Sequence, residues 1–121
     1  MKRKFDSFIR DTLEYIEKTE RFVSEMNYED FSMDEKTGLA VIRCIEVIGE
    51  AAKNIPEHVR DKYPQIPWKD MAGMRDIIAH AYFGIDMRRI WEVVTVKLPP
   101  LKKHIRQLLD DIAYGEFDGC R

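Results

Sequence analysis

The chain has 121 residues, of which 45% are hydrophobic and 35% charged, and its formal net charge is −2. This length suits one domain, and the composition is typical of a soluble globular protein rich in amphipathic helices. The charge excludes a strongly basic nucleic-acid coat, although a local basic patch is compatible with it. No apolar run approaches the roughly 20 residues of a membrane span, and the basic start lacks the apolar segment of a signal peptide. We therefore expect a cytoplasmic protein without a membrane partner.

Neither the cysteines nor the histidines have the spacing of a metal site. Cys44 and Cys120 are far apart in the chain, which fits a buried thiol and a tail thiol in a reducing compartment. No two of the three histidines are spaced as metal ligands, and we expect His58 and His104 at the surface. We expect no metal and no cofactor.

Residues 3–26 carry apolar side chains at steps of three and four, which predicts one long amphipathic helix. The predicted stripe consists of Phe5, Phe8, Ile9, Thr12, Leu13, Ile16 and Val23. Residues 27–32 follow as a predicted loop. Ser32 and Glu35 are spaced as in a capping box, so we expect a second helix to begin at Met33.

The second predicted helix extends to about Lys53 and is unusually apolar. Its two apolar stripes are Gly38, Val41, Ile42, Ile45, Ile48, Gly49 and Ala52, and Ala40, Cys44, Val47 and Ala51. So little polar surface predicts burial on more than one side, either at the centre of a bundle or in a subunit interface. The remaining polar line is Arg43, Glu46, Glu50 and Lys53. It forms either an internal salt-bridge ladder or one wall of a polar cleft.

Prolines divide the next part of the chain. Pro56 ends the second helix, and residues 56–63 can form two short turns. Pro67 suits the first position of a third helix. Gly84 marks the end of that helix, and Asp86 marks the cap of the next.

A fourth helix is predicted over Met87–Lys97, and Pro99 and Pro100 interrupt or kink it before a fifth helix that ends near Ala113. No segment alternates with the period of a strand. We therefore expect an all-α bundle of four to five helices. It forms a single domain over residues 1–113, with residues 114–121 as a frayed tail.

Polar chemistry gathers in the third helix, where Arg75, Asp76, His80 and Tyr82 stand within eight residues of otherwise apolar sequence. Residues four apart are neighbours on a helix, so Asp76 can accept the imidazole N–H of His80 and fix its tautomer and orientation. Arg75 and Tyr82 are seven apart and share a different face if the helix continues past His80. The plainer alternative is structural: Arg75 pairs with Asp70 or Asp76, and His80 is a hydrogen-bonded residue near a helix end.

An arginine and a histidine near one anion, without metal ligands, suit phosphoryl transfer within RNA. His80 would serve as general base or acid, a role that contributes about 10²–10⁴-fold. Arg75 would hold the phosphate through two parallel hydrogen bonds and stabilise the charge of the transition state. The 2′-hydroxyl supplies the nucleophile, and the product carries a 2′,3′-cyclic phosphate. The two side chains lie roughly 140° apart on one helix, so a second helix or subunit would help them converge.

The segment Arg75–Tyr82 resembles the R-x-x-x-x-H-x-Y signature of the HepT-like branch of the HEPN superfamily, in which Asp76 is an accepted variant of the residue after the arginine. The other landmarks, in the family's order, are Glu46–Ala51, Ile66–Trp68, Gly73–Arg75, Tyr82 with Ile85–Asp86, Trp91, and Leu98–Pro99 with Leu101. The resemblance covers nearly the whole chain.

The resemblance implies an all-α HEPN-type bundle that forms a homodimer, with Arg75 and His80 of both subunits lining a cleft at the interface. It implies a metal-independent ribonuclease toxin of a toxin–antitoxin pair, with RNA as substrate. The implied partner is an MntA-type minimal nucleotidyltransferase antitoxin, which transfers AMP from ATP to Tyr82 and so blocks the site. The alternative is a non-catalytic helical module that binds a nucleotidyltransferase partner or a nucleotide.

Two further groups of residues have structural interpretations as well as functional ones. The aromatic residues Trp68, Tyr82, Phe83 and Trp91 are most simply core. Basic residues of the fourth and fifth helices either guide RNA or form solvated helix faces, and we favour the second for most of them. They are Arg88, Arg89, Lys97, Lys102, Lys103 and Arg106.

Overall fold

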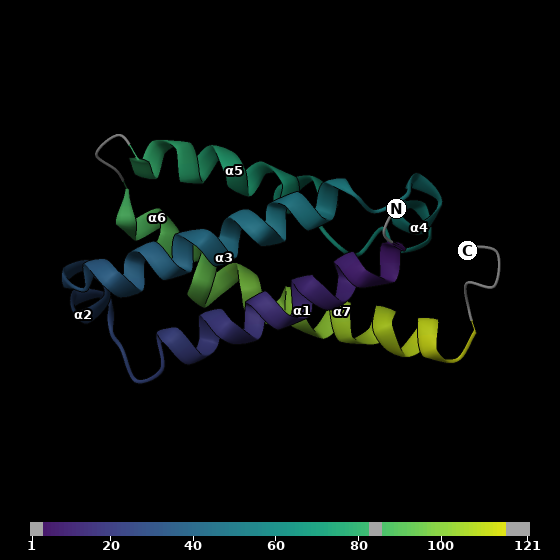
Figure 1. Ribbon diagram of the computed structural model, residues 1–121, viewed down its shortest axis with the longest axis horizontal. Coiled ribbons are helices and arrows are strands. Elements are labelled where there is room, and N and C mark those ends of the chain that lie inside the picture. The colour runs from purple at the N-terminus through teal and green to yellow at the C-terminus, as the bar shows by residue number, and fades with distance from the viewer. Residues whose placement is uncertain (1–3, 83–85, 116–121) are drawn as a thin grey trace.

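The computed structural model describes residues 4–82 and 86–115, with the side chains of Arg75 and of residues 79–82 outside this description. The described chain is all-α and contains no strand, as predicted (Figure 1). Its elements are α1 (Phe5–Phe22), α2 (Tyr28–Met33), α3 (Glu35–Lys53), α4 (Glu57–Lys62), α5 (Trp68–Tyr82), α6 (Met87–Glu92), the π-helical segment η1 (Val93–Lys97) and α7 (Leu98–Ala113). None of the described helices is both long and apolar enough to cross a membrane.

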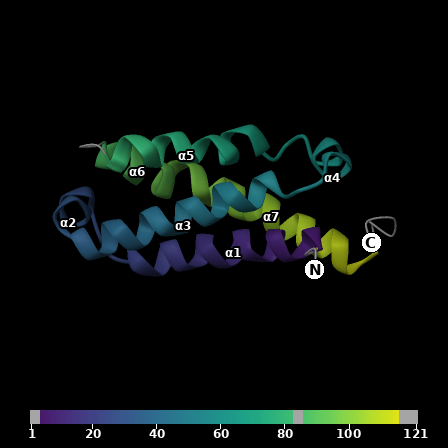
Figure 2. The same ribbon diagram turned by 45° about the horizontal axis from the view of Figure 1, so that its top comes forward.

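Helix α3 lies at the centre of the bundle. It packs against α1 on one side and against α5 on the other, and both views show it between them (Figures 1 and 2). Helix α7 packs against α1, and α6 packs against α5 and α2. Nine residues of α3 are buried, from Gly38 to Ala52. Of the two positions that its apolar stripes allowed, α3 takes the centre of the bundle.

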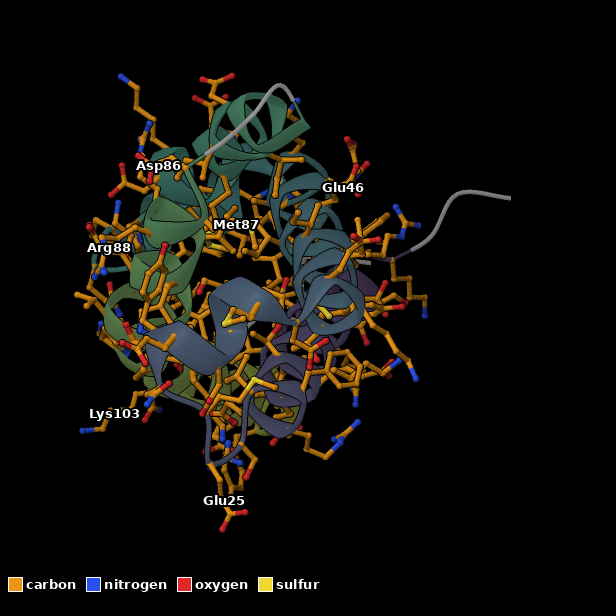
Figure 3. All side chains as sticks on the ribbon, turned by 90° about the vertical axis from the view of Figure 1, so that its left-hand side faces the viewer. Glu25, Glu46, Asp86, Met87, Arg88 and Lys103 are labelled. Carbon is orange, nitrogen blue, oxygen red and sulfur yellow. The ribbon has the colours of Figure 1, made fainter. Side chains whose placement is uncertain are left out.

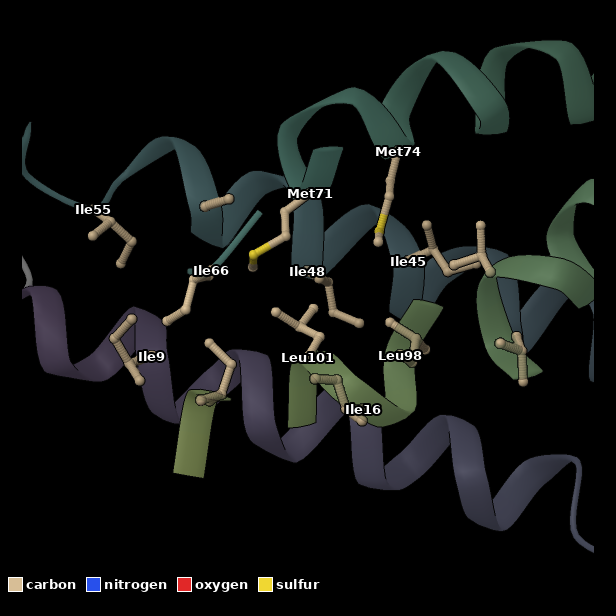
Figure 4. Close-up of a cluster of buried hydrophobic side chains, with 14 of the residues drawn as sticks. Ile9, Ile16, Ile45, Ile48, Ile55, Ile66, Met71, Met74, Leu98 and Leu101 are labelled. Carbon is tan, nitrogen blue, oxygen red and sulfur yellow. The ribbon is translucent and has the colours of Figure 1, made fainter. Parts of the chain in front are cut away.

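The core joins all the long helices through branched aliphatic side chains (Figure 4). Ile9 and Ile16 of α1 and Ile45 and Ile48 of α3 are completely buried, and they meet Leu101 of α7 in the same cluster. The stripe predicted for the first helix is thus the core-facing stripe of α1. Two buried positions of α1 are threonines, of which the predicted stripe included only Thr12, and both are satisfied locally. Their hydroxyls donate to the carbonyl four residues earlier, at 2.9 Å for Thr12 and 2.8 Å for Thr19.

The predicted start of the second helix is wrong. Residues 28–33 form the short helix α2 rather than a loop, and its capping box is formed by Asn27 and Asp30. Phe31 is fully buried, which fixes α2 against the bundle. The Ser32 hydroxyl caps nothing and donates to the Glu29 carbonyl at 2.9 Å.

Helix α3 begins at Glu35, and Asp34 is its N-cap. The Asp34 carboxylate accepts hydrogen bonds from the backbone N–H of Thr37 at 3.0 Å and from its hydroxyl at 2.8 Å. These two bonds hold the pKa of Asp34 below its ordinary value.

The segment between α3 and α5 is short but firmly anchored. It contains one short helix, α4, rather than two separate turns, and Val59 and Tyr63 are buried. The Tyr63 hydroxyl donates to the Asp111 carboxylate of α7, and the Tyr63 carbonyl accepts a 3.0 Å hydrogen bond from Trp68 Nε1. These bonds tie the start of α5 to the far side of the bundle.

The two adjacent prolines change the helix type instead of breaking the helix. Helices α6 and α7 are joined without a gap by η1, and Pro99 and Pro100 lie in the first turn of α7. The Leu98 N–H donates to the Val93 carbonyl five residues earlier, which is the π-helical pattern. Proline has no N–H to give, so the preceding carbonyls lose their usual partners, and the wider turn accommodates this loss. The predicted kink is therefore a π-helical turn.

Truncation of Ile48 to alanine will test the central role of α3. Ile48 is fully buried, so Ile48→Ala should lower the free energy of unfolding by about 2–5 kcal/mol. Leu39 of the same helix is 55% exposed, and Leu39→Ala should change it by less than about 0.5 kcal/mol. Urea unfolding followed by circular dichroism measures both. Equal losses in the two variants would contradict the packing described here.

Candidate active site

Helix α5 carries the whole predicted motif on one continuous stretch of backbone. It runs from Trp68 to Tyr82, and the Met71 N–H donates to the Pro67 carbonyl at 3.0 Å at its start. The predicted start at Pro67 is therefore correct to within one residue. Because the helix continues past His80 to Tyr82, the condition for Arg75 and Tyr82 to share a face is met.

The inner and outer sides of α5 are distinct. Met71, Met74 and Ile78 are buried against the core, where two of them are seen beside α3 in Figure 4. Asp70 and Asp76 are exposed. The three buried residues are spaced three and four apart, so they share one side of α5. The polar side of the helix therefore faces outward.

Of the four predicted site residues, only Asp76 has a described side chain, and it is exposed. The side chains of Arg75, His80 and Tyr82 lie outside the described residues. The Asp76–His80 pair, the Arg75–Tyr82 pair and the alternative pairing of Arg75 with Asp70 or Asp76 therefore stay predictions. Gly84, the predicted end of the helix, also lies outside the described residues. The Asp86 cap is confirmed, since its side chain accepts from the Arg89 N–H at 3.3 Å.

The outer side of α5 also has an open notch at Gly73. An added Cβ at this position would meet no atom within 4 Å. Gly73 is three residues before Asp76 and seven before His80, so all three positions are neighbours along one side of the helix. A glycine inside a helix lowers the stability of the helix relative to alanine. The missing side chain leaves open space in which a ligand could approach the motif.

The polar line of α3 borders a cavity of 270 Å³ between α1 and α3. Arg43, Glu46 and Glu50 line it, together with Asp11 of α1 and Asn54 at the end of α3. Glu46 is labelled in Figure 3 on the α3 side of the molecule. No salt bridge joins Arg43 to Glu46 within the described part of the chain.

The arrangement supports a polar cleft rather than a ladder. The fourth member of the predicted line, Lys53, is exposed and does not line the cavity. Asp11 and Asn54 were missed by the sequence analysis. Neither stands in a motif, and only packing brings Asp11 of α1 to α3.

The basic residues divide into two groups. Lys102 pairs with Glu20 at 2.7 Å, and Arg106 pairs with Glu17 at 3.0 Å, so these two α7 side chains are bound to α1. Arg88, Arg89, Lys97 and Lys103 are exposed, and none of the four forms an ion pair with a described residue. The first group therefore has a structural role, the second group has the exposure of a solvated helix face, and a role of any of these residues in guiding RNA stays a prediction.

The remaining described histidines, cysteines and carboxylates form no metal site. Among the residues whose side chains the structure describes, no group of three His, Cys, Asp or Glu could hold a metal ion. His58 is exposed as predicted, and His104 is half-buried. Cys44 is buried as predicted, and burial raises the pKa of its thiol. Cys120 lies outside the described residues.

An all-α bundle with an R-x-x-x-x-H-x-Y motif on a single helix next to its central helix defines a HEPN-type domain. The chain belongs to the HepT-like ribonuclease family, because the family model described as ribonuclease HepT-like matches residues 12–108. This match begins within α1, ends within α7 and includes the motif.

Similar proteins match over nearly their whole length. The protein named "Probable ribonuclease HepT" from Thermococcus cleftensis is 47% identical over 108 residues, which cover 89% of this chain and 98% of that protein. "Putative RNase MJ1216" from Methanocaldococcus jannaschii is 44% identical over 111 residues, which cover 92% of each chain. "Putative RNase MJ0125" from the same organism is 43% identical over 111 residues, which cover 92% of this chain and 96% of that one. No solved structure matches the chain significantly.

The notch at Gly73 gives a prediction about stability. Gly73→Ala should raise the free energy of unfolding by about 0.5–1 kcal/mol, because alanine favours the helix and meets no neighbour. Gly38→Ala is the matched control, since its Cβ would lie 3.0 Å from Met87 Cε and the methionine would have to move. Thermal unfolding of both variants measures the difference. A destabilised Gly73→Ala protein would contradict the open space described at this position.

Proposed function

We propose that this protein is a metal-independent endoribonuclease. The single observation that carries the proposal is the complete R-x-x-x-x-H-x-Y motif on α5, inside a match to the HepT-like ribonuclease family that extends from α1 to α7. The relatives named as ribonucleases support the same activity. The exposed polar side of α5 and the notch at Gly73 are compatible with the approach of an RNA strand.

The proposed reaction is a transesterification within RNA. His80 accepts the proton of a 2′-hydroxyl, whose oxygen attacks the adjacent phosphorus. The bond from phosphorus to the 5′-oxygen of the next nucleotide breaks, that oxygen receives a proton from water as it leaves, and His80 returns its proton to the solvent. The products are a 2′,3′-cyclic phosphate end and a 5′-hydroxyl end, so atoms and protons balance without a cofactor.

Arg75 and Asp76 have supporting roles in this proposal. Arg75 binds the phosphate oxygens and stabilises the negative charge that grows in the transition state. Asp76 is four residues before His80 and, as its hydrogen-bond acceptor, selects the tautomer that can take the proton. Neither role needs a metal ion.

We further propose that the active form is a homodimer. Arg75 and His80 are five residues apart, so one α5 helix directs them to different sides. Two copies related by a two-fold axis can bring an arginine from one subunit near a histidine of the other.

The proposed biological setting is a toxin–antitoxin pair. An MntA-type minimal nucleotidyltransferase would neutralise the ribonuclease by transferring AMP from ATP to the Tyr82 hydroxyl. Each adenylyl group adds bulk and negative charge close to His80 in the chain, and both would repel RNA phosphates.

Replacement of His80 tests the activity. His80→Ala should lower the rate of RNA cleavage by about 10²–10⁴-fold, because the proton acceptor is lost. His58→Ala is the matched control, since His58 is exposed and lies outside α5. Gel analysis of a labelled RNA, with and without EDTA, measures both the rate and the metal dependence. Cleavage that survives in His80→Ala, or that stops in EDTA, would contradict the proposal.

The antitoxin proposal predicts a specific modification. After incubation with an MntA-type nucleotidyltransferase and ATP, the intact mass should rise by one or more adenylyl groups, and ribonuclease activity should fall. Tyr82→Phe should keep its mass and its activity under the same treatment. Mass spectrometry of the α5 peptide locates the group. An unmodified Tyr82 in the wild-type protein would refute this part of the proposal and leave the ribonuclease intact.

A further inference from the structure

Arg88 stacks on an aromatic cluster at one end of the bundle. Its guanidinium carbon lies 3.9 Å from the centre of the Tyr28 ring. Tyr28 meets Trp91 edge to face, with ring centres 6.4 Å apart, and Phe31 also packs on Trp91, with ring centres 5.1 Å apart. We call Arg88 and Tyr28 the Arg88–Tyr28 stack.

The cluster holds the stack in place. Phe31 is fully buried and Trp91 is partly buried against the core, so the ring that supports Tyr28 is fixed. Tyr28 itself is the first residue of α2, directly after the Asn27 capping box. A guanidinium on such a rigid ring loses less conformational freedom when it binds a ligand than a free side chain does.

The exposed Arg88 has its charge available. It forms no ion pair with a described residue, whereas Lys102 and Arg106 are paired with α1 glutamates. Two carboxylates at the caps of α6 and α2 accept backbone hydrogen bonds: Asp86 accepts from the Arg89 N–H, and Asp30 accepts from the Asn27 N–H at 3.2 Å. Arg89 adds a second exposed positive charge beside Arg88.

The stack also lies near the motif. Helix α6 packs against α5, and Asp86, the cap of α6, is four residues after Tyr82. Four residues span at most about 14 Å, so the start of α6 is within that distance of the Tyr82 backbone. In Figure 3, Asp86 and Arg88 are labelled close together on the left of the view, and Glu46 is labelled on the opposite side.

We propose that the Arg88–Tyr28 stack is an RNA subsite that selects a single-stranded segment beside the cleavage point. One face of the guanidinium rests on Tyr28, its edge donates to a phosphate, and its outer face stacks on an unpaired base. Paired RNA does not offer a base in this way. This subsite rests on the proposed ribonuclease activity and adds a residue that acts in binding rather than in catalysis.

Four variants separate stacking from charge. Arg88→Ala removes both, and Arg88→Lys keeps the charge but loses the planar stack. Tyr28→Leu removes the ring beneath the arginine, and Tyr28→Phe keeps it. Lys103→Ala is the charge-matched control, because Lys103 is equally exposed but lies on α7.

The experiment measures cleavage kinetics and equilibrium binding of one labelled RNA, single-stranded or annealed to its complement. Binding is measured in the His80→Ala background at several salt concentrations. In Arg88→Ala we expect KM and Kd for the single strand to rise about 5- to 100-fold, as for the loss of one stacked base. We expect kcat to stay the same. The slope of the logarithm of the binding constant against the logarithm of the salt concentration should fall in magnitude by about 0.7. Arg88→Lys should keep the slope and lose affinity, whereas Tyr28→Phe and Lys103→Ala should resemble the wild type.

The outcomes distinguish this inference from the proposed function. If the wild type cleaves RNA but Arg88→Ala has an unchanged KM, Kd and salt slope, the subsite is refuted and the ribonuclease stands. Equal affinity for single-stranded and annealed RNA would refute the proposed selectivity. If the wild type cleaves no RNA, the proposed function fails, and the binding measurements still decide whether Arg88 contacts RNA. Circular dichroism of each variant confirms that the helices are intact.

Discussion

The architecture depends on the burial of α3 on two sides. A helix can be covered by two long neighbours only if its surface is apolar almost all round and its side chains allow close approach. Four small residues of α3, Gly38, Gly49, Ala51 and Ala52, are buried and provide that approach. Because α3 fixes both α1 and α5, it also determines which side of α5 faces outward. The exposure of Asp70 and Asp76 is thus a consequence of packing elsewhere.

Most of this fold could be predicted from periodicity. The long helices, the central place of α3 and the cap at Asp86 all follow from local patterns that tertiary packing preserves. The start of α3 could not be predicted in the same way. Ser32 and Glu35 satisfy the local rule for a capping box. The burial of Phe31, a long-range effect, instead places residues 28–33 in the separate helix α2, and Asp34 caps α3.

The site shows the same division between local and long-range information. The motif of α5 is legible in the sequence because its members are local. Asp11 beside Arg43, and Tyr28 beneath Arg88, come from segments more than thirty residues away, and only the folded chain joins them. The paired state of Lys102 and Arg106 likewise depends on the register of α1 against α7. Charge counts alone could not separate these basic residues from Arg88.

The π-helical segment η1 has a consequence for how the chain tolerates changes in length. Each residue of an α-helix rotates the chain by about 100° around the helix axis. A π-helical turn holds more residues per turn than an α-helical one, so it changes the rotation of the following helix relative to the preceding one. Helix α7 is held to α1 by its ion pairs, and α6 is held to α2 by its aromatic contacts. The insertion or deletion of one residue in Val93–Lys97 would rotate one attachment relative to the other. This segment therefore sets the rotation of α7 relative to α6. Its length is constrained even where its side chains are exposed.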